Sequence, residues 1–163
     1  MGEEKRFTTY IDSALGWIEI GSNETHIKTL YFHDEVGESD KSVPRVLQDA
    51  RKQVSNYFNR KFKFFTLPLE PEGTDFRKTV WDELLNIQFG KTCSYLELSR
   101  RIGNEKAIRA VGTANGSNPI SLIIPCHRVI GSDGSLTGYG GGLWRKKWLL
   151  EFEAESKQGD LFG

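Results

Sequence analysis

Cys126, His127 and Arg128 follow one another in the segment Pro125-Cys-His-Arg-Val129, and their side chains are suited to nucleophilic chemistry. The thiolate is the reactive form of cysteine, and a neighbouring imidazole or guanidinium cation lowers the pKa of a thiol. We therefore predict that Cys126 is half exposed, has a lowered pKa and acts as a nucleophile. The alternative is that Cys126 is a small buried packing residue, as most free cysteines are.

Two flanking segments would hold this nucleophile. The apolar run Ile120–Ile124 is expected to be a buried strand or a core segment, and it ends at Pro125 because proline lacks the N–H that a strand ladder needs. After Val129 comes a glycine-rich loop, Gly131–Gly142, which lacks the Lys-Ser/Thr of a phosphate-binding loop. Its glycines instead favour a close approach of the backbone to a ligand.

A final helix is predicted after this loop from the spacing of its apolar residues. These residues are expected to face inward and the paired lysines outward, with a carboxylate near the C-terminal end of the helix. The inward residues are Trp144, Trp148, Leu149 and Phe152, the lysines are Lys146 and Lys147, and the carboxylate is Glu153.

Upstream of the nucleophile, two short helices are predicted from 94 to 102 and from 105 to 114. Ser94-Tyr-Leu-Glu97 matches a capping box, and Gly103-Asn104 supplies a C-terminal glycine followed by a new N-cap. Two short helices joined by such a turn are typical of a helix-turn-helix, although simple helix packing is the alternative. The second helix combines positive charge with small residues: Lys106, Ala107, Arg109, Ala110 and Gly112.

The first part of the chain favours β-structure. Three segments rich in β-branched and aromatic residues (7–11, 17–20 and 26–32) predict an antiparallel sheet, and apolar residues at helical spacing predict a helix from about 44 to 58. Phe62 and Phe64, with Leu67 as a further candidate, indicate one more short strand. Pro68–Gly73 has the composition of a linker, and a helix from 74 or 75 to about 90 follows it.

These elements predict an α+β fold with three parts. Residues 1–70 form a supporting domain with a small antiparallel sheet and a helix. Residues 74–155 form a mainly helical domain that carries the helix-turn-helix and the nucleophile, and residues 156–163 form a tail.

Charge and cysteine content limit the classes of function. The net charge of the 163 residues is zero, but residues 91–148 hold nine Lys/Arg against three acids, which favours a phosphate-bearing partner. No apolar run approaches the roughly 20 residues of a membrane span, and the N-terminus does not read as a signal peptide. We therefore expect a cytoplasmic protein, in which Cys93 and Cys126 are free thiols. No metal-binding spacing of Cys and His is present, so no metal is expected.

Several short motifs occur in a recognisable order between Phe76 and Glu153, about half of the chain. They are Ser94-Tyr95, Arg109-Ala-Val-Gly112, Asn118-Pro119, Pro125-Cys-His-Arg-Val129, Tyr139-Gly-Gly-Gly142 and Glu153. This set resembles the active-site signature of the O6-alkylguanine-DNA alkyltransferases. Some members of that family carry a structural zinc near the N-terminus, but no cysteine precedes Cys93 here, and we do not transfer that zinc to this chain.

The resemblance implies a reaction and a set of roles. The protein would repair double-stranded DNA by a single-turnover transfer of an alkyl group from O6-alkylguanine to Cys126, without a cofactor and as a monomer on the nucleoid. The resemblance leaves O4-alkylthymine open as a second substrate. The catalytic residues would be Cys126, His127, Glu153 and Asn118; the substrate-binding residues Tyr95, Val129, Tyr139 and Gly140; and the DNA-binding residues Lys106, Ala107, Arg109, Ala110 and Arg128. Arg109 would replace a base that the protein flips out of the duplex.

Two other classes of protein remain as alternatives. Alkyltransferase-like proteins share this scaffold but are non-catalytic modules that bind the lesion and recruit other repair factors. They lack the reactive cysteine, which this sequence has. A cysteine hydrolase would need a histidine from elsewhere in the fold, such as His26 or His33.

The C-terminal segment Gln158-Gly-Asp-Leu-Phe162 resembles the pentapeptide by which bacterial proteins bind the sliding clamp. Its anchors would be Gln158, Leu161 and Phe162. The alternatives are a disordered tail, as termini usually are, or a segment that folds back onto the domain.

Overall fold

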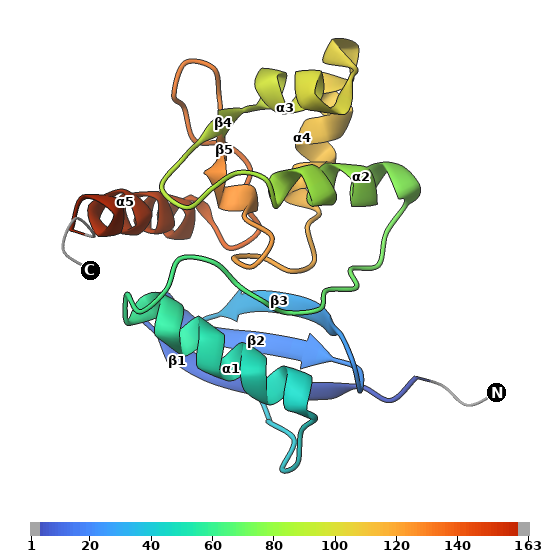
Figure 1. Ribbon diagram of the computed structural model, residues 1–163, viewed down its shortest axis with the longest axis vertical. Helices are drawn as coiled ribbons and strands as arrows, with labels where there is room; N and C mark the ends of the chain where they lie inside the picture. The colour runs from blue at the N-terminus through green and yellow to red at the C-terminus, as the bar shows by residue number, and fades with distance from the viewer. Residues whose placement is uncertain (1–3, 160–163) are drawn as a thin grey trace. The chain divides into compact units, whose positions relative to one another are not determined.

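The computed structural model describes residues 4–159 and divides the chain into two compact units, Met1–Glu72 and Gly73–Gly163 (Figure 1). The first unit holds a three-stranded antiparallel sheet and one helix, and the second is mainly helical. The predicted α+β class is confirmed. Within the described residues, no helix is both long and apolar enough to cross a lipid bilayer.

The first unit is a meander of three strands covered by one helix. Strands β1 (Phe7–Ser13), β2 (Gly16–Ser22) and β3 (Ile27–His33) lie in the order β1-β2-β3, with Ile11 opposite Ile18 and Ile20 opposite Leu30. Helix α1 (Arg45–Phe58) lies across the sheet and contacts all three strands (Figure 1). Its inward residues, Val46, Leu47, Ala50, Val54 and Tyr57, are buried, which explains their helical spacing.

The short strand predicted around Phe62 and Phe64 does not form. Phe62 and Phe65 pack edge-to-face with 5.7 Å between ring centroids, Phe65 stacks on Tyr57 of α1 at 5.6 Å, and Phe64 is 73% exposed. The aromatic residues therefore pack against the helix and one another, and no β-ladder is needed to bury them. A β-bridge forms a few residues further along the chain, where Leu69 pairs in parallel with Ile27.

The second unit contains helices α2 (Asp75–Leu84), α3 (Tyr95–Ile102), α4 (Ile108–Gly116) and α5 (Leu143–Gly159). It also contains the parallel strand pair β4 (Cys93–Ser94) and β5 (Val129–Ile130), and the 3-10 turns η1 (Glu105–Ala107) and η2 (Cys126–Arg128). Helix α2 ends earlier than the predicted 90. The N–H groups of residues 85–87 bond three residues back, so the chain leaves the helix through successive tight turns.

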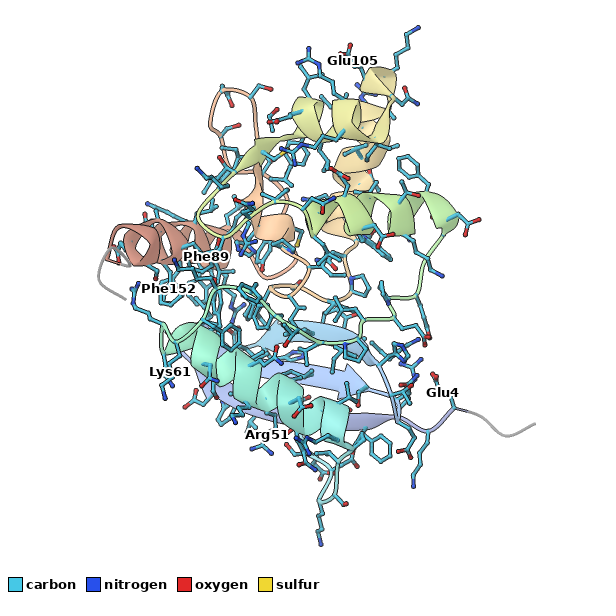
Figure 2. All side chains as sticks on the ribbon, in the orientation of Figure 1. Glu4, Arg51, Lys61, Phe89, Glu105 and Phe152 are labelled. Carbon is cyan, nitrogen blue, oxygen red and sulfur yellow. The ribbon has the colours of Figure 1, made fainter. Side chains whose placement is uncertain are left out.

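The predicted helix-turn-helix is formed by α3, η1 and α4. Ser94 Oγ accepts from the N–H of Glu97 at 3.0 Å, and Gly103 has φ = 89°, the left-handed conformation expected of a glycine that ends a helix. Asn104 caps the following turn, and Glu105, which Figure 2 labels at this turn, pairs with Nε of Arg100 at 2.6 Å. Hydrogen bonds between near neighbours in the sequence therefore determine where α3 begins and how the turn between α3 and α4 starts.

The apolar run Ile120–Ile124 is core and not strand. Its residues are buried, but the backbone turns: Ile124 N–H bonds to the Ile120 carbonyl at 3.0 Å, and Leu122 has φ = 72°. Asn118 competes with any β-ladder because its side chain bonds to both ends of the run. This turn leads directly into η2 and the nucleophile.

Candidate active site

Cys126 begins the 3-10 turn η2. Pro125 has φ = −81° and ψ = 62°, close to an inverse γ-turn, and the N–H of Cys126 bonds back to the Ile124 carbonyl at 2.8 Å. The Cys126 side chain is buried, with 4% of the residue exposed. Burial raises the pKa of this thiol, against the opposing effects of the Asn118 hydrogen bond and the charge of Lys146. The prediction of a half-exposed thiol with a lowered pKa is wrong, because desolvation outweighs the charge of Lys146 and the hydrogen bonds to the thiol.

A buried imidazole–carboxylate pair lies beside the nucleophile. Nε2 of His127 is 2.8 Å from Oε2 of Glu153, and both side chains are buried, with 0% and 1% exposed. Burial alone would raise the pKa of Glu153, but His127 and Arg128 more than offset it and hold that pKa well below its usual range. Burial also lowers the pKa of His127, although Glu153 opposes this. At neutral pH the pair is therefore a charged carboxylate and a neutral imidazole.

The hydrogen bond to Glu153 also determines which nitrogen of His127 carries the proton. A carboxylate can only accept, so Nε2 holds the hydrogen and Nδ1 keeps its lone pair. Nδ1 is buried and has no hydrogen-bond partner within residues 4–159. A neutral imidazole with a free lone pair, adjacent in sequence to a thiol, is equipped to accept the proton of that thiol.

Arg128 does not extend toward a partner as predicted. Its Nε and Nη2 donate to Oε1 and Oε2 of Glu153 at 2.8 and 3.0 Å, and its Nη1 donates to the Ile87 carbonyl at 2.6 Å. The guanidinium also lies over the ring of Phe89, 5.7 Å from its centroid, and the residue is 6% exposed. The expected DNA contact of Arg128 is contradicted by this burial, because the donors that would meet a phosphate are used inside the protein.

Lys146 also differs from its prediction. It was expected to face outward, yet it is fully buried. Its Nζ donates to the Thr137 carbonyl at 2.8 Å and lies 3.5 Å from the hydroxyl of Tyr95. Conversely, Trp144 was expected to face inward and is 53% exposed. Because Lys146, Leu149 and Glu153 are spaced by three and four residues, they share one face of α5, and this is the face that turns inward. That spacing was the signal in the sequence for the role of Lys146.

Asn118 and the loop tyrosine complete the surroundings of the thiol. Nδ2 of Asn118 donates to the Ile124 carbonyl at 2.8 Å, and its Oδ1 accepts from the N–H of Ile120 at 2.9 Å. Tyr139 is buried, and burial, with the nearby Cys126 and Glu153, raises the pKa of its hydroxyl well above its ordinary value. Val129 is buried in β5, whereas Gly140 is exposed.

An open cleft of about 550 Å³ lies between the helix-turn-helix and the glycine-rich loop. It is lined by Tyr95, Ile108, Arg109, Gly112, Thr113, Thr137 and Gly138. The Tyr95 hydroxyl donates to the Thr137 carbonyl at 3.1 Å and so ties α3 to the loop. A Cβ built at Gly112 would lie 3.8 Å from the Tyr95 ring, an ordinary van der Waals distance, so α4 and the tyrosine are close neighbours here. The cleft therefore joins two predicted site residues, Tyr95 and Arg109.

The remaining predicted residues fall into two groups. Lys106, Arg109 and Ala110 are exposed on η1 and α4, and Ala107 is half-buried there. The predicted clamp-binding residues lie beyond what the structure describes: only the backbone of Gln158 is described, and Leu161 and Phe162 are outside residues 4–159. Cys93 is a buried free thiol, and burial raises its pKa to about 11.

Comparisons with known proteins cover both units. Residues 6–71 match a family model described as the ribonuclease-like domain of 6-O-methylguanine DNA methyltransferase, and residues 75–155 match the DNA binding domain of the same family. A methylated-DNA–protein-cysteine methyltransferase of Methanosarcina barkeri is 45% identical over 150 residues, which cover 88% of this chain and 94% of the relative.

Solved structures agree with these matches. The crystal structure of the Mycobacterium tuberculosis O6-methylguanine methyltransferase superimposes with a TM-score of 0.84 at 40% identity, and the alignment covers 93% of this chain and 94% of that one. The same mycobacterial protein in complex with DNA gives a TM-score of 0.82 at 40% identity, covering 91% and 93%.

Proposed function

The chain belongs to the 6-O-methylguanine DNA methyltransferase family, which repairs DNA by transferring an alkyl group to a protein cysteine, and we propose that Cys126 is that cysteine. The observation that carries the proposal is the buried thiol next to a neutral imidazole whose other nitrogen is held by Glu153. The other cysteine, Cys93, lies in β4, and its thiol donates to the Ser94 carbonyl at 3.4 Å.

The proposed reaction is a displacement at the alkyl carbon on O6 of guanine. Nδ1 of His127 accepts the proton of the Cys126 thiol, directly or through one water, and the imidazolium that forms is stabilised by Glu153. The thiolate attacks the alkyl carbon, a C–S bond forms, and the C–O6 bond breaks with its electron pair going to guanine. A proton neutralises the leaving guanine. The thioether that remains is not opened by thiol exchange, so each chain reacts once.

The high pKa of the buried thiol fits a reaction that starts only when the substrate is present. In the resting site the thiol stays protonated, since burial penalises the thiolate. Removal of the thiol proton by His127 keeps the charge inside the buried His127–Glu153–Arg128 cluster. We propose that Lys146, whose charge acts on Cys126 to lower its pKa, further stabilises the developing thiolate.

Access of the base to Cys126 requires flipping, because the reacting atom inside a duplex is out of reach of a buried thiol. The exposed Arg109 on α4 and the cleft at Tyr95 support a route in which Arg109 takes the vacated place in the stack and Tyr95 contacts the extruded base. The hydroxyl of Tyr95, which lies 3.5 Å from Nζ of Lys146, is the proposed source of the proton for the leaving guanine. The proton that His127 took from the thiol is released to solvent, from which Tyr95 is reprotonated, so that the thiol proton in effect passes to guanine. The backbone of Val129, Tyr139 and Gly140 is proposed to contact the edge of the extruded base.

The test is intact-protein mass spectrometry after incubation with O6-benzylguanine, and with duplex DNA that contains O6-methylguanine. We expect one alkyl group per chain, mapped to the peptide of Cys126. Cys126→Ser should bind DNA without being alkylated. Cys93→Ser should be alkylated like the chain without substitutions. Several turnovers per chain would favour a hydrolase, and a chain that binds the lesion but stays unmodified would favour a recruiting module. The same assay with O4-alkylthymine measures the second substrate.

The C-terminal segment carries a separate proposal about partners. We infer that Gln158, Leu161 and Phe162 anchor the tail in a pocket of a bacterial sliding clamp, with an affinity of about micromolar, near −8 kcal/mol. Such docking would hold a protein that reacts once near newly replicated DNA. A fluorescence titration with a bacterial clamp should show binding by the full chain and none by a chain that ends at Lys157. Equal binding by both chains would refute the proposal, and alkyl transfer without clamp should be the same for both.

A further inference from the structure

The turn that carries the nucleophile is held by two buried asparagines. Asn118 donates from Nδ2 to the carbonyl of Ile124, two residues before Cys126, at 2.8 Å. Asn115 donates from Nδ2 to the carbonyl of Cys126 itself at 3.3 Å. Both residues are buried, with 6% and 1% exposed. The Ile124–Pro125 and Cys126–His127 peptide groups are therefore each bound by an amide side chain, and of these two asparagines only Asn118 belongs to the motifs of the sequence.

Asn115 reaches the nucleophile from α4, the helix that carries the proposed DNA contacts. It is the penultimate residue of α4, and Arg109 near the other end of the same helix is exposed on the cleft. The neighbouring residue, Ala114, receives a different buried hydrogen bond, from Nε1 of Trp81 on α2 at 2.8 Å. One bond thus connects α4 to the nucleophile, and the adjacent bond connects α4 to the core.

The amide of Asn115 is only half used. Because a carbonyl needs a donor, Nδ2 must face Cys126, and this orientation leaves Oδ1 in the interior. Oδ1 is buried and has no hydrogen-bond partner among the described residues. A buried acceptor without a partner costs free energy, which a leucine or methionine of similar size would avoid. The hydrogen bond from Nδ2 to the Cys126 carbonyl offsets part of this free-energy cost.

We propose that Asn115 is a positioning residue for alkyl transfer, which fixes the peptide plane of Cys126 relative to the recognition helix. The inference rests on the proposed role of Cys126 as the nucleophile. Displacement at the alkyl carbon requires Sγ, the carbon and O6 to lie nearly in line, and a misplacement of about 1 Å can lower such a rate about 100-fold. With the Cys126 carbonyl held by α4, the same helix that meets the duplex sets the direction from which Sγ attacks.

The test compares two substitutions that remove neighbouring hydrogen bonds of α4. Asn115→Leu removes the bond to Cys126, and Trp81→Phe is the matched control that removes the bond to Ala114. For each chain we would measure the maximal rate of benzylation at saturating O6-benzylguanine, the rate of reaction with iodoacetamide, and Tm. Iodoacetamide is small and chooses its own orientation, so its rate reports thiol exposure and pKa but not alignment. Asn115→Met serves as a second variant if the leucine does not fold.

Asn115→Leu is expected to lower the maximal benzylation rate about 10- to 100-fold, with an unchanged iodoacetamide rate and an equal or higher Tm. The loss should be the same with duplex DNA that contains O6-methylguanine. Trp81→Phe is expected to lower Tm and keep the maximal benzylation rate. Benzylation of Asn115→Leu at the unsubstituted rate would overturn the inference, as would a parallel loss of both reactivities or an equal loss in Trp81→Phe. If the unsubstituted chain is not benzylated at Cys126, the proposed function itself has failed.

Discussion

Arg128→Met tests whether the cation next to His127 serves the fold or the DNA. The substitution keeps an unbranched apolar stem and removes the guanidinium, which makes two bonds to Glu153 and one to the Ile87 carbonyl. Glu153 then remains as a buried carboxylate with His127 as its main partner. Breaking a buried ion pair by removal of one partner costs about 3–5 kcal/mol. For a chain of this size each kcal/mol lowers Tm by about 2–4 °C, so Tm should fall by about 6–20 °C.

The assay has a stability arm and a DNA arm. Tm and urea unfolding would be measured beside the control Lys147→Met, which removes an exposed cation of the same helix as Glu153 and should change stability by no more than about 0.5 kcal/mol. Binding to undamaged duplex DNA would be followed by fluorescence anisotropy over a range of salt. Loss of a phosphate contact lowers the salt slope by about 1, and we expect no such change for Arg128→Met.

The pH dependence adds an internal check. The folded-state pKa of Glu153 is lowered, so the stability it contributes is present above its unfolded-state pKa and is lost as pH falls through the folded value. The penalty of Arg128→Met should therefore shrink in acid, where the carboxyl becomes neutral. A variant with Tm near that of the unsubstituted chain and a reduced salt slope would refute the structural role, and would restore Arg128 as a DNA contact.

Three further predictions concern the site. Arg109→Ala should slow repair in duplex DNA by a factor that reflects the few kcal/mol of base flipping, with little effect on free O6-benzylguanine; equal losses on both substrates would show that Arg109 acts in the chemistry. Burial lowers the pKa of His127, so as pH falls the histidine is protonated in the unfolded chain before it is protonated in the folded one. The free energy of unfolding measured by urea titration should therefore decrease as pH drops below about 6.5, and His127→Gln should flatten that part of the pH profile. Lys146→Met should raise the pKa of Cys126, visible as a shift of the iodoacetamide pH profile to higher pH, and an unshifted profile would exclude electrostatic support of the thiolate by Lys146.

The sequence by itself determined the features that depend on near neighbours. The caps at Ser94 and Asn104 and the glycine at 103 are formed by groups two to three residues apart, so their local patterns were sufficient to place the helix-turn-helix. The apolar periodicity of α1 was sufficient in the same way, because one face of a helix follows from its spacing alone. The order of the short motifs was sufficient to identify the family.

Only the tertiary structure decided what the charged and polar groups of the site do. Arg128 meets Ile87 and Glu153, 41 and 25 residues away, Lys146 meets Tyr95 at a separation of 51, and Asn115 meets Cys126 across the turn. The charge of a side chain is readable in a sequence, but its exposure depends on which distant segments cover it. The residues next to Cys126 in the sequence predict a low thiol pKa, yet the pKa is raised, because the fold buries the thiol and removes the water that would stabilise a thiolate.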